Sequence, residues 1–392
     1  MKIRLGQPSR SFPYFIYAAV IYYLFICILH LASRRPPWLD EILLINNLKE
    51  LSLKEIFGQL RYGQGFPRIY LLIIYKLGKA FNYNVISLRI LPFVFMLTGF
   101  GLWLGIFRKA VGRGESYLLF ILSWCGSIYM TYYAAEFKQY SADVFAAGVF
   151  TYFILRQKES VALLRPRISL ILQYSSLPFL VLFSYTGYFF IPVVLYNLLL
   201  LCVKNKKDFI YLMAYLLSAL AVVFISYNLD LKHTLAMPGI KNYWKDYFIS
   251  LSSPGGFLTS LGEGLRNIFI KWFWKDAPVT WVMTIFMPFG LYYIVSRGIK
   301  QFKDDSSFVI SLDALAPALL TGLFTAAALQ ILPFTATRLT IFIAPFIFYV
   351  IIRGIELPKN KFFWFYAVLI SIFIFTLLYI STRLIWRYSG EY

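Results

Sequence analysis

The chain has 392 residues, of which 60% are hydrophobic, 20% are aromatic and only 14% are charged. A soluble domain has about 25% charged residues, and even a large one keeps a polar exterior. The composition therefore excludes a soluble enzyme, a disordered chain and a secreted disulfide scaffold, and it indicates an integral membrane protein. The net charge of +20 fits basic cytoplasmic loops. Nucleic acid is not an expected partner, because no basic helix or known binding motif occurs.

The apolar runs predict an all-α polytopic membrane protein with about eleven spans in one domain, residues 1–392. The first run follows the basic segment MKIRLGQPSR and is too long for a typical signal peptide, so we expect a first span with a cytoplasmic N-terminus. The last run ends shortly before the C-terminus, which predicts no soluble C-terminal domain. The predicted spans cover about 12–31, 85–107, 115–134, 140–155, 168–185, 187–203, 209–228, 278–296, 308–330, 338–353 and 362–381.

One apolar segment, FPRIYLLIIYKLGKAF (66–81), is too short to be counted among the spans. A span needs about 20 apolar residues, so we expect this basic, apolar segment to lie at the membrane surface. Two longer segments, about 32–84 and 229–277, then become outer loops. The basic loops fall on the cytoplasmic side: RKAVGRG (108–114), RQKESVALLRPR (156–167), KNKKD (204–208), SRGIKQFK (296–303) and RGIELPKNK (353–361).

The cysteines and histidines predict neither a disulfide framework nor a metal site. Cys27, Cys125 and Cys202 lie in apolar runs without CxxC spacing. His30 and His233 are too few for a multi-histidine site, and we interpret them as interfacial or loop residues.

The first outer loop begins RRPPWLDEILLINNL and places Asp40 and Glu41 at the start of an amphipathic helix. Ser52-Leu53-Lys54-Glu55 is a capping box, so a second short helix is expected there. The acidic pair would then lie near the lipid headgroups. It is either a site for general-base chemistry or a solvated helix cap, and the residues alone leave both interpretations open.

A second cluster lies in TYYAAEFKQYSADVF (131–145). On a continuous helix Glu136, Tyr140 and Asp143 would share one face, while Lys138 would point elsewhere. A charge inside the bilayer costs about 2.5–3.5 kcal/mol, so such residues normally face a cavity and indicate a functional site. The alternative is an interfacial cluster that anchors the helix ends.

A third candidate is Arg338, at the outer start of a span in ILPFTATRLTIFIAPF (331–346). Its planar guanidinium matches phosphate oxygens, and the alternative is an anchor that reaches toward the membrane interface. The second outer loop contains NYWKDYF and IKWFWKDAP, whose aromatic residues and lysines suit an interfacial surface.

Taken in order, these motifs resemble the polyprenyl-phosphate-sugar-dependent glycosyltransferases of the GT-C fold, which include protein mannosyltransferases and aminoarabinose transferases. The acidic pair of the family is matched by WLDEILL, its Arg-Leu-Pro element by SLRILPF, its glycine-basic loop by FRKAVGRG, and its Tyr-Ser-Arg-Glu-Ala-Arg-Met-Tyr pattern by YYAAEFKQY. A late Pro-Arg-Pro element is matched within 333–345. The chain departs from the family at GFPR (65–68), where the family has His-Pro-Pro-Leu, and at Ala135 and Lys138, where it has arginines.

The resemblance implies a multi-pass GT-C protein of the inner (plasma) membrane with outer interfacial helices and an active site on the outer face. A sugar would pass, with inversion, from a polyprenyl-phosphate donor to a hydroxyl of a glycan, lipid or protein acceptor, in contact with membrane lipids. A divalent metal is the only cofactor left open. The implied roles are a base at Asp40, support for the acceptor or a metal from Glu41 and Glu136, donor-phosphate contacts from Lys138, Tyr140 and Arg338, and further substrate contacts from Arg68, Arg89 and Asp143.

Two other classes of protein also fit many spans. A lipid or polysaccharide flippase would explain charges within the membrane, but the ionisable groups here cluster at the outer surface and no internal repeat is found. A non-catalytic scaffold or assembly partner is the third class. Loss of a lipid-linked donor during incubation with the protein would separate an enzyme from both.

Overall fold

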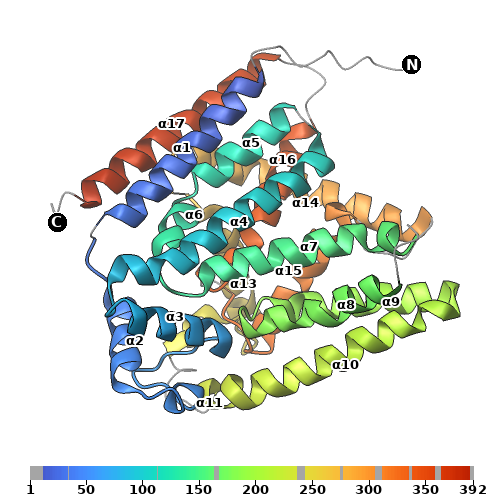
Figure 1. Cartoon of the computed structure of the whole chain (residues 1–392). Helices are drawn as coiled ribbons and strands as arrows, with labels where there is room; N and C mark the ends of the chain where they lie inside the picture. The colour runs from blue at the N-terminus through green and yellow to red at the C-terminus, as the bar shows by residue number, and fades with distance from the viewer. Residues whose placement is uncertain are drawn as a thin grey trace.

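The computed structural model describes residues 12–33, 35–112, 114–162, 167–235, 243–273, 277–304, 311–334, 338–357 and 363–388. Most of these residues are helical, and none of them forms a β-strand (Figure 1). The all-α architecture expected from the composition is confirmed. In chain order the helices are α1 (Phe12–Ala32), α2 (Leu39–Glu50), η1 (Glu55–Phe57), α3 (Arg68–Ala80), α4 (Val85–Val111), α5 (Glu115–Cys125), α6 (Ile128–Tyr132), η2 (Tyr133–Ala135), α7 (Tyr140–Ala162), α8 (Arg167–Ser176), η3 (Leu177–Leu182), α9 (Gly187–Lys204), η4 (Lys206–Asp208), α10 (Phe209–Ser226), η5 (Tyr227–Leu231), α11 (Lys232–Leu235), η6 (Lys245–Tyr247), α13 (Pro254–Ile270), α14 (Val279–Asp304), α15 (Leu312–Ala328), η7 (Ile341–Ile343), α16 (Ala344–Glu356) and α17 (Phe363–Tyr388).

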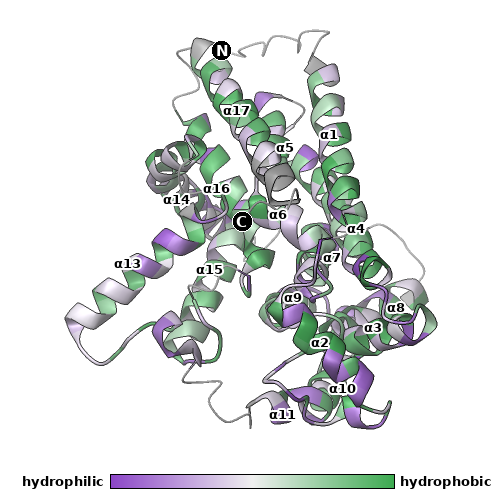
Figure 2. Cartoon of the chain, turned by 90° about the vertical axis from the view of Figure 1, so that its left-hand side faces the viewer, coloured by the Kyte–Doolittle hydropathy of each residue, from purple (hydrophilic) through white to green (hydrophobic). Residues whose placement is uncertain are grey.

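The long helices make the chain a multi-pass membrane protein. Figure 2 shows hydrophobic residues along α1, α4 and α17, with hydrophilic stretches in α2 and α13. Among the described residues, the helices long and apolar enough to cross a membrane are Tyr14–Ala32, Val85–Val111, Gly187–Lys204, Lys206–Thr234 and Val279–Gln301. The bent pair Glu115–Cys125 and Ile128–Ala135 adds one candidate, and shorter apolar helices lie at Ile168–Leu182, Leu312–Ala328 and Phe365–Tyr379. The full count of eleven spans stays a prediction.

The helices α4 and α7 form the most extensive pair in the bundle. Gly99 allows the approach, because a Cβ atom there would lie 3.3 Å from the backbone of Phe145. The indole of Trp103 also donates a hydrogen bond across the pair, to the carbonyl oxygen of Val144 at 3.1 Å. The first turns of α7 are thereby held against the middle of α4, and both helices carry predicted site residues.

The predicted span 115–134 is broken at Gly126. Its two halves, α5 and the segment Ile128–Ala135, are bent by 59° relative to each other. A Cβ atom on Gly126 would lie only 2.9 Å from the carbonyl oxygen of Leu122, so glycine permits the tight turn. The hydroxyl of Ser127 then donates to the carbonyl oxygen of Trp272 at 3.0 Å. The bend brings the chain at Glu136 back toward the first outer loop.

The first outer loop builds a small core of its own. Leu44 and Leu48 of α2 pack in one cluster with Leu71 and Ile74 of α3 and with Phe137. The helix predicted at 66–81 forms as α3, which spans 13 residues, and its place at the membrane surface stays a prediction. The loop is therefore a packed layer against the first half of α4 and not a loose connection.

The capping box of the first outer loop forms as expected but starts a shorter helix. Glu55 accepts a hydrogen bond from the backbone N–H of Ser52 at 2.7 Å. The backbone N–H of Glu55 in turn donates to the Ser52 hydroxyl. The helix that follows is the single 3-10 turn η1.

At the opposite end of the bundle, Arg353 of α16 links several helices. Its Nη2 donates to the carbonyl oxygen of Ala110 in α4 at 3.0 Å, and its Nε lies 3.9 Å from the Asp313 carboxylate of α15. Glu356 pairs with Arg353 and also accepts a hydrogen bond from Ser116 of α5. The described parts of the basic loops at 108–112 and 353–357 therefore lie at the end of the bundle away from the first outer loop.

Candidate active site

Asp40 and Arg338 form an ion pair at the outer-loop end of the bundle, although 298 residues separate them in the sequence. Arg338 Nη1 donates a hydrogen bond to Asp40 Oδ2 at 2.9 Å. Asp40 lies in the first turn of α2, where the helix dipole favours a carboxylate. The side chains of Asp40 and Arg338 are 23% and 22% exposed. A ligand can therefore reach both charges.

Lys138 supplies a second cation to the same carboxylate. Its Nζ lies 4.0 Å from Asp40 Oδ2, and it donates a hydrogen bond to Gln64. The ammonium also lies 4.7 Å from the centre of the Phe66 ring. The Tyr70 hydroxyl donates a hydrogen bond to the Lys138 carbonyl oxygen at 2.7 Å. Burial lowers the pKa of Lys138, while Asp40 and Glu136 act in the opposite direction.

Two indole rings flank the guanidinium of Arg338. Its Cζ atom lies 5.9 Å from the ring centre of Trp38 and 5.2 Å from that of Trp244. A backbone hydrogen bond of 2.8 Å from Phe334 to Tyr247 places the second outer loop beside Phe334, four residues before Arg338 in the sequence. Both outer loops thus contribute to the surroundings of the Asp40–Arg338 pair. Aromatic faces stabilise a cation without using up its N–H donors.

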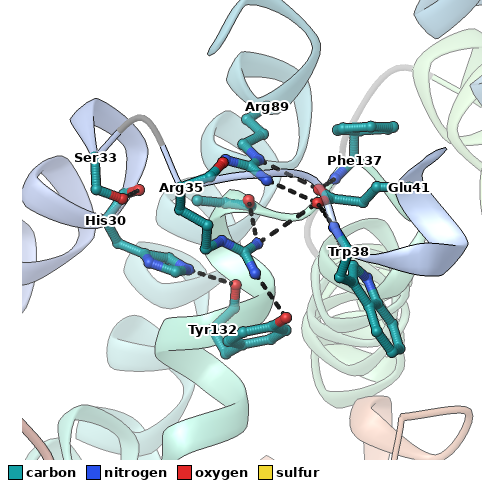
Figure 3. A network of polar contacts seen from close by, with 9 residues as sticks. His30, Ser33, Arg35, Trp38, Glu41, Arg89, Tyr132 and Phe137 are labelled. Carbon is teal, nitrogen blue, oxygen red and sulfur yellow. Dashed lines mark hydrogen bonds and ion pairs between the residues drawn. The ribbon is translucent and has the colours of Figure 1, made fainter. Parts of the chain in front are cut away.

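Glu41 is fully buried in a separate network, drawn in Figure 3. Arg89 of α4 binds the carboxylate with two hydrogen bonds, at 3.2 Å from Nε and 2.7 Å from Nη2. Arg35 lies 3.8 Å away, and the backbone N–H groups of Trp38 and Phe137 also donate to the carboxylate. The network ties the start of α2 to α4 and to the chain after η2.

Glu136 is fully buried, and neither of its carboxyl oxygens receives a hydrogen bond from a residue that the structure describes. Burial raises its pKa, and the nearby Glu41 raises it further. Lys138, Trp38 and Arg35 act in the opposite direction. The expected helical face of Glu136, Tyr140 and Asp143 is wrong, because α7 begins at Tyr140 and residues 136–139 are not helical.

The remaining predicted residues divide between this site and its surroundings. Tyr140 is buried against Tyr133, with ring centres 4.7 Å apart, and it interacts electrostatically with Arg338. Asp143 accepts a hydrogen bond from Ser184, which lies just before α9. Arg68 joins the two outer loops by donating to the carbonyl oxygens of Gly58 and Leu229.

The structure therefore brings Asp40, Lys138 and Arg338 together, with Tyr140 and Glu136 beside them. Glu41 and Arg89 form the adjoining buried network, whereas Arg68 and Asp143 contact other groups.

Four residues at the site were not among the sequence candidates: Arg35, Trp38, Gln64 and Trp244. Trp38 and Arg35 stand two and five residues before Asp40, so their position was a usable signal. Gln64 and Trp244 meet the site only through tertiary contacts, and no pattern marks them.

The residues of the site do not fit a divalent metal. In the part of the chain that the structure describes, no group of three or more His, Cys, Asp and Glu side chains could hold a metal ion. The carboxyl group of Glu136 has cationic neighbours at Lys138 and Arg35, and these would repel a metal ion.

The fold and the site define a multi-pass helical membrane protein with one carboxylate held between two cations. No protein-family model and no curated protein matches the sequence. Two solved structures are similar, both of ArnT from Cupriavidus metallidurans. The structure bound to undecaprenyl phosphate is 14% identical, with a TM-score of 0.49, over 90% of this chain. The apo structure is 13% identical, with a TM-score of 0.37, over 87% of this chain and 77% of ArnT. This chain spans 61% of the ArnT chain in the first comparison.

Proposed function

We propose that this chain is a membrane glycosyltransferase of the GT-C fold that moves a sugar from a polyprenyl-phosphate donor to an acceptor hydroxyl. The observation that carries the proposal is the position of Asp40 Oδ2, 2.9 Å from Arg338 Nη1 and 4.0 Å from Lys138 Nζ. Transfer from a lipid phosphate needs a base for the acceptor and cations for the leaving group. Both kinds of group meet here at one accessible carboxylate.

The proposed base is Asp40. It takes the proton of the acceptor hydroxyl as the oxygen attacks the anomeric carbon from the face opposite the phosphate. The bond between that carbon and the phosphate oxygen breaks, its electron pair stays with the phosphate, and the configuration inverts. General-base catalysis of this kind contributes about 10²–10⁴-fold. The negative charge of Asp40 also favours the oxocarbenium character of the anomeric carbon.

The proposed ligands of the donor phosphate are Arg338 and Lys138, with Tyr140 beside them. Both cations contact Asp40, so a phosphate that binds them competes with the carboxylate for their N–H donors. That competition weakens the hold of Arg338 on Asp40 and leaves the carboxylate freer to accept a proton. Because the phosphate gains charge as the sugar leaves, these contacts are strongest in the transition state.

The other predicted residues take supporting roles in this proposal. Glu41 and Arg89 hold α2 in place and so position Asp40, and Glu136 supports the acceptor side of the site from its buried position near Lys138. Arg68 fixes the first outer loop against Leu229, and Asp143 orients α7 through Ser184. As the acceptor we propose a glycan, lipid or protein hydroxyl.

We place the proposed active site on the outer face of the inner (plasma) membrane, in a single domain. The support is the position of the basic loops at the other end of the bundle, since such loops remain cytoplasmic. Single cysteines introduced at 204–208 in intact cells should resist an impermeant thiol reagent, whereas a cysteine at exposed Asp246 should react. Labelling at 204–208 would reverse the proposed orientation.

The function is tested with purified protein and a panel of polyprenyl-phosphate sugars, by measuring loss of the lipid-linked donor. We expect one donor class to be consumed, and the Asp40→Asn variant to consume it far more slowly. A flippase would instead move a labelled lipid across a vesicle membrane and leave its sugar bond intact. That outcome would overturn the enzymatic proposal.

A further inference from the structure

Gln64 lies in a tight turn of the first outer loop, and its side chain reaches Lys138, although no motif assigned it a role. The ammonium of Lys138 donates a hydrogen bond to Gln64 Oε1. Because an ammonium group can only donate, the amide oxygen of Gln64 has to face it. The amide nitrogen then lies 3.5 Å from the carbonyl oxygen of Tyr62, in the same turn. Gln64 is buried, so this contact is part of the packed loop and not of its surface.

Helix α2 fixes the turn that carries Gln64. The side chain of Asn47 in α2 forms two hydrogen bonds with the backbone of Arg61: Nδ2 donates to the carbonyl oxygen at 2.9 Å, and Oδ1 accepts from the N–H at 2.8 Å. Tyr62 follows with a φ of 59°, a positive value that is uncommon outside glycine. Asn47 lies seven residues after Asp40, about two helical turns further along α2. One helix therefore positions both Asp40 and the turn with Gln64.

The contacts of the Lys138 ammonium differ in kind. Asp40 Oδ2 lies 4.0 Å away, which is too long for a hydrogen bond but close enough for charge attraction. The ring centre of Phe66 lies 4.7 Å away and contributes a cation–π contact. Gln64 supplies a hydrogen bond to the ammonium and, being neutral, does not compete for a phosphate. The amide oxygen therefore fixes the direction of the ammonium and leaves its charge available.

The charge of Lys138 is sensitive to its surroundings. Burial lowers its pKa to about 8, and the nearby Arg338 lowers it further. Asp40, Glu136 and Glu41 act in the opposite direction. A hydrogen-bond acceptor on the ammonium also favours the charged form. Loss of that acceptor should therefore discharge Lys138 at a lower pH.

We propose that Gln64 is a positioning residue, which holds the Lys138 side chain beside Asp40 as a cation for the donor phosphate. The inference rests on the proposed function, in which Lys138 binds that phosphate. It adds that the first outer loop, through Gln64, controls the pH range in which the lipid phosphate binds.

The experiment measures the affinity of the purified chain for undecaprenyl phosphate between pH 6.5 and pH 9.5. The affinity of the original chain should fall as the pH rises, because Lys138 loses its proton. Gln64→Leu removes the acceptor and keeps an apolar side chain of similar size. The midpoint of the fall should move to lower pH by about one unit, the effect of one lost hydrogen bond to a charged group.

A second variant should move the midpoint in the opposite direction. Gln64→Glu has the same shape and places a carboxylate on the ammonium, so the midpoint should rise by about one pH unit. Gln173→Leu is the matched control, because Gln173 of α8 contacts Ser169 away from the site. Its profile should match that of the original chain. The lipid phosphate titrates identically in every sample, so differences between chains report the protein.

A double variant tests whether Gln64 acts through Lys138. Lys138→Met removes the titrating ammonium and should flatten the fall of affinity with pH. Gln64→Leu added to Lys138→Met should then shift nothing further. A shift of the same size in this background would mean that Gln64 acts on another group, and would overturn the proposal. Thermal unfolding of each variant records any loss of stability separately.

The outcomes separate the role of Gln64 from the proposed function. If the original chain does not bind undecaprenyl phosphate, the proposed donor fails and this inference fails with it. If the original chain binds and Gln64→Leu keeps the same pH profile, only the role of Gln64 is wrong. If Gln64→Leu loses all binding, Gln64→Glu decides, and a midpoint that does not rise would overturn the proposal.

Discussion

Asp40 and Glu41 are neighbours in the chain but belong to two different regions of the molecule. Glu41 and its partner Arg89 are fully buried, and the guanidinium meets the carboxylate with two hydrogen bonds. Asp40 and its partner Arg338 remain 23% and 22% exposed, and a single hydrogen bond joins them. The Glu41–Arg89 pair is closed to solvent and the carboxylate is fully hydrogen-bonded. The Asp40–Arg338 pair is open to solvent, so each group can exchange its partner for a ligand.

Helix geometry explains the difference between the two neighbours. Consecutive residues of an α-helix point about 100° apart, so the first turn of α2 directs Glu41 at α4 and Asp40 at Arg338 and Lys138. An acidic pair can therefore combine a residue that fixes the helix with a residue that performs chemistry. The following predictions test whether the two roles separate as the geometry implies.

We expect the largest effect from removing one partner of the buried Glu41–Arg89 pair. Glu41→Leu leaves Arg89 buried without a counter-charge, and removing one partner of a buried pair costs about 3–5 kcal/mol. Thermal unfolding of the purified chain should show this loss. Glu50→Leu is the control on the same helix, because its pair with Arg61 is exposed and contributes about 0–1 kcal/mol.

The double variant Glu41→Leu/Arg89→Leu adds a second check on the closed pair. Replacing both charges with apolar side chains should recover part of the lost stability, because no unpaired charge remains buried. A double variant less stable than Glu41→Leu would contradict the interpretation of this pair as a mainly structural contact.

A substitution in the partly exposed Asp40–Arg338 pair should lower turnover and leave stability unchanged. Asn at position 40 keeps the size of Asp and its hydrogen bond from Arg338, but it cannot take up the acceptor proton. Asp40→Asn should therefore lower turnover by about 10²-fold or more while thermal unfolding stays close to that of the original chain. Asp246→Asn, in the second outer loop, should change neither quantity. Near-normal turnover of Asp40→Asn would move the base to Glu41 or Glu136.

Sequence patterns predicted the helices better than the partners of their side chains. The apolar runs at 12–31 and 187–203 match α1 and α9 within about one residue, because length and hydropathy determine a long apolar helix. The pairing of Arg89 with Glu41 depends on how α2 packs on α4, which no local pattern records. The helical face expected for Glu136 was wrong because tertiary contacts, such as the hydrogen bond from Tyr70 to Lys138, hold 136–139 outside α7.

Arg338, which precedes α16, and Arg353, in the last turn of α16, extend the comparison between the two kinds of ion pair. Arg338 meets Asp40 at the open site, while Arg353 is enclosed by Asp313, Glu356 and the Ala110 carbonyl. Arg338→Ala should weaken donor affinity and turnover by about 10- to 100-fold, the effect of a charge-assisted hydrogen bond. Arg338→Lys keeps the charge but loses the planar fork, so its loss should be smaller.

Arg353→Lys is the matched control for Arg338→Lys. It should lower the unfolding temperature and leave donor affinity unchanged, because Arg353 lies at the other end of the bundle. If Arg338→Ala turns over normally at saturating donor with unchanged donor affinity, Lys138 becomes the main phosphate ligand.

The smallest expected effect concerns pH and the buried carboxyl group of Glu136, which lies between the two pairs. Its folded pKa is raised by burial and by Glu41 above its ordinary value of 4.5. From pH 4.5 upward the unfolded chain has already lost this proton while the folded chain retains it, so stability falls as the pH rises toward the raised pKa. Glu136→Gln cannot titrate, and it also removes a charge that raises the pKa of Lys138, which changes the comparison in the same direction. The unfolding temperature of the original chain should therefore fall relative to Glu136→Gln between about pH 5 and pH 8, on the order of a few degrees. The exposed substitution Glu50→Gln should leave the pH profile unchanged, and parallel profiles for the original chain and Glu136→Gln would show that Glu136 is ionised like an exposed carboxylate.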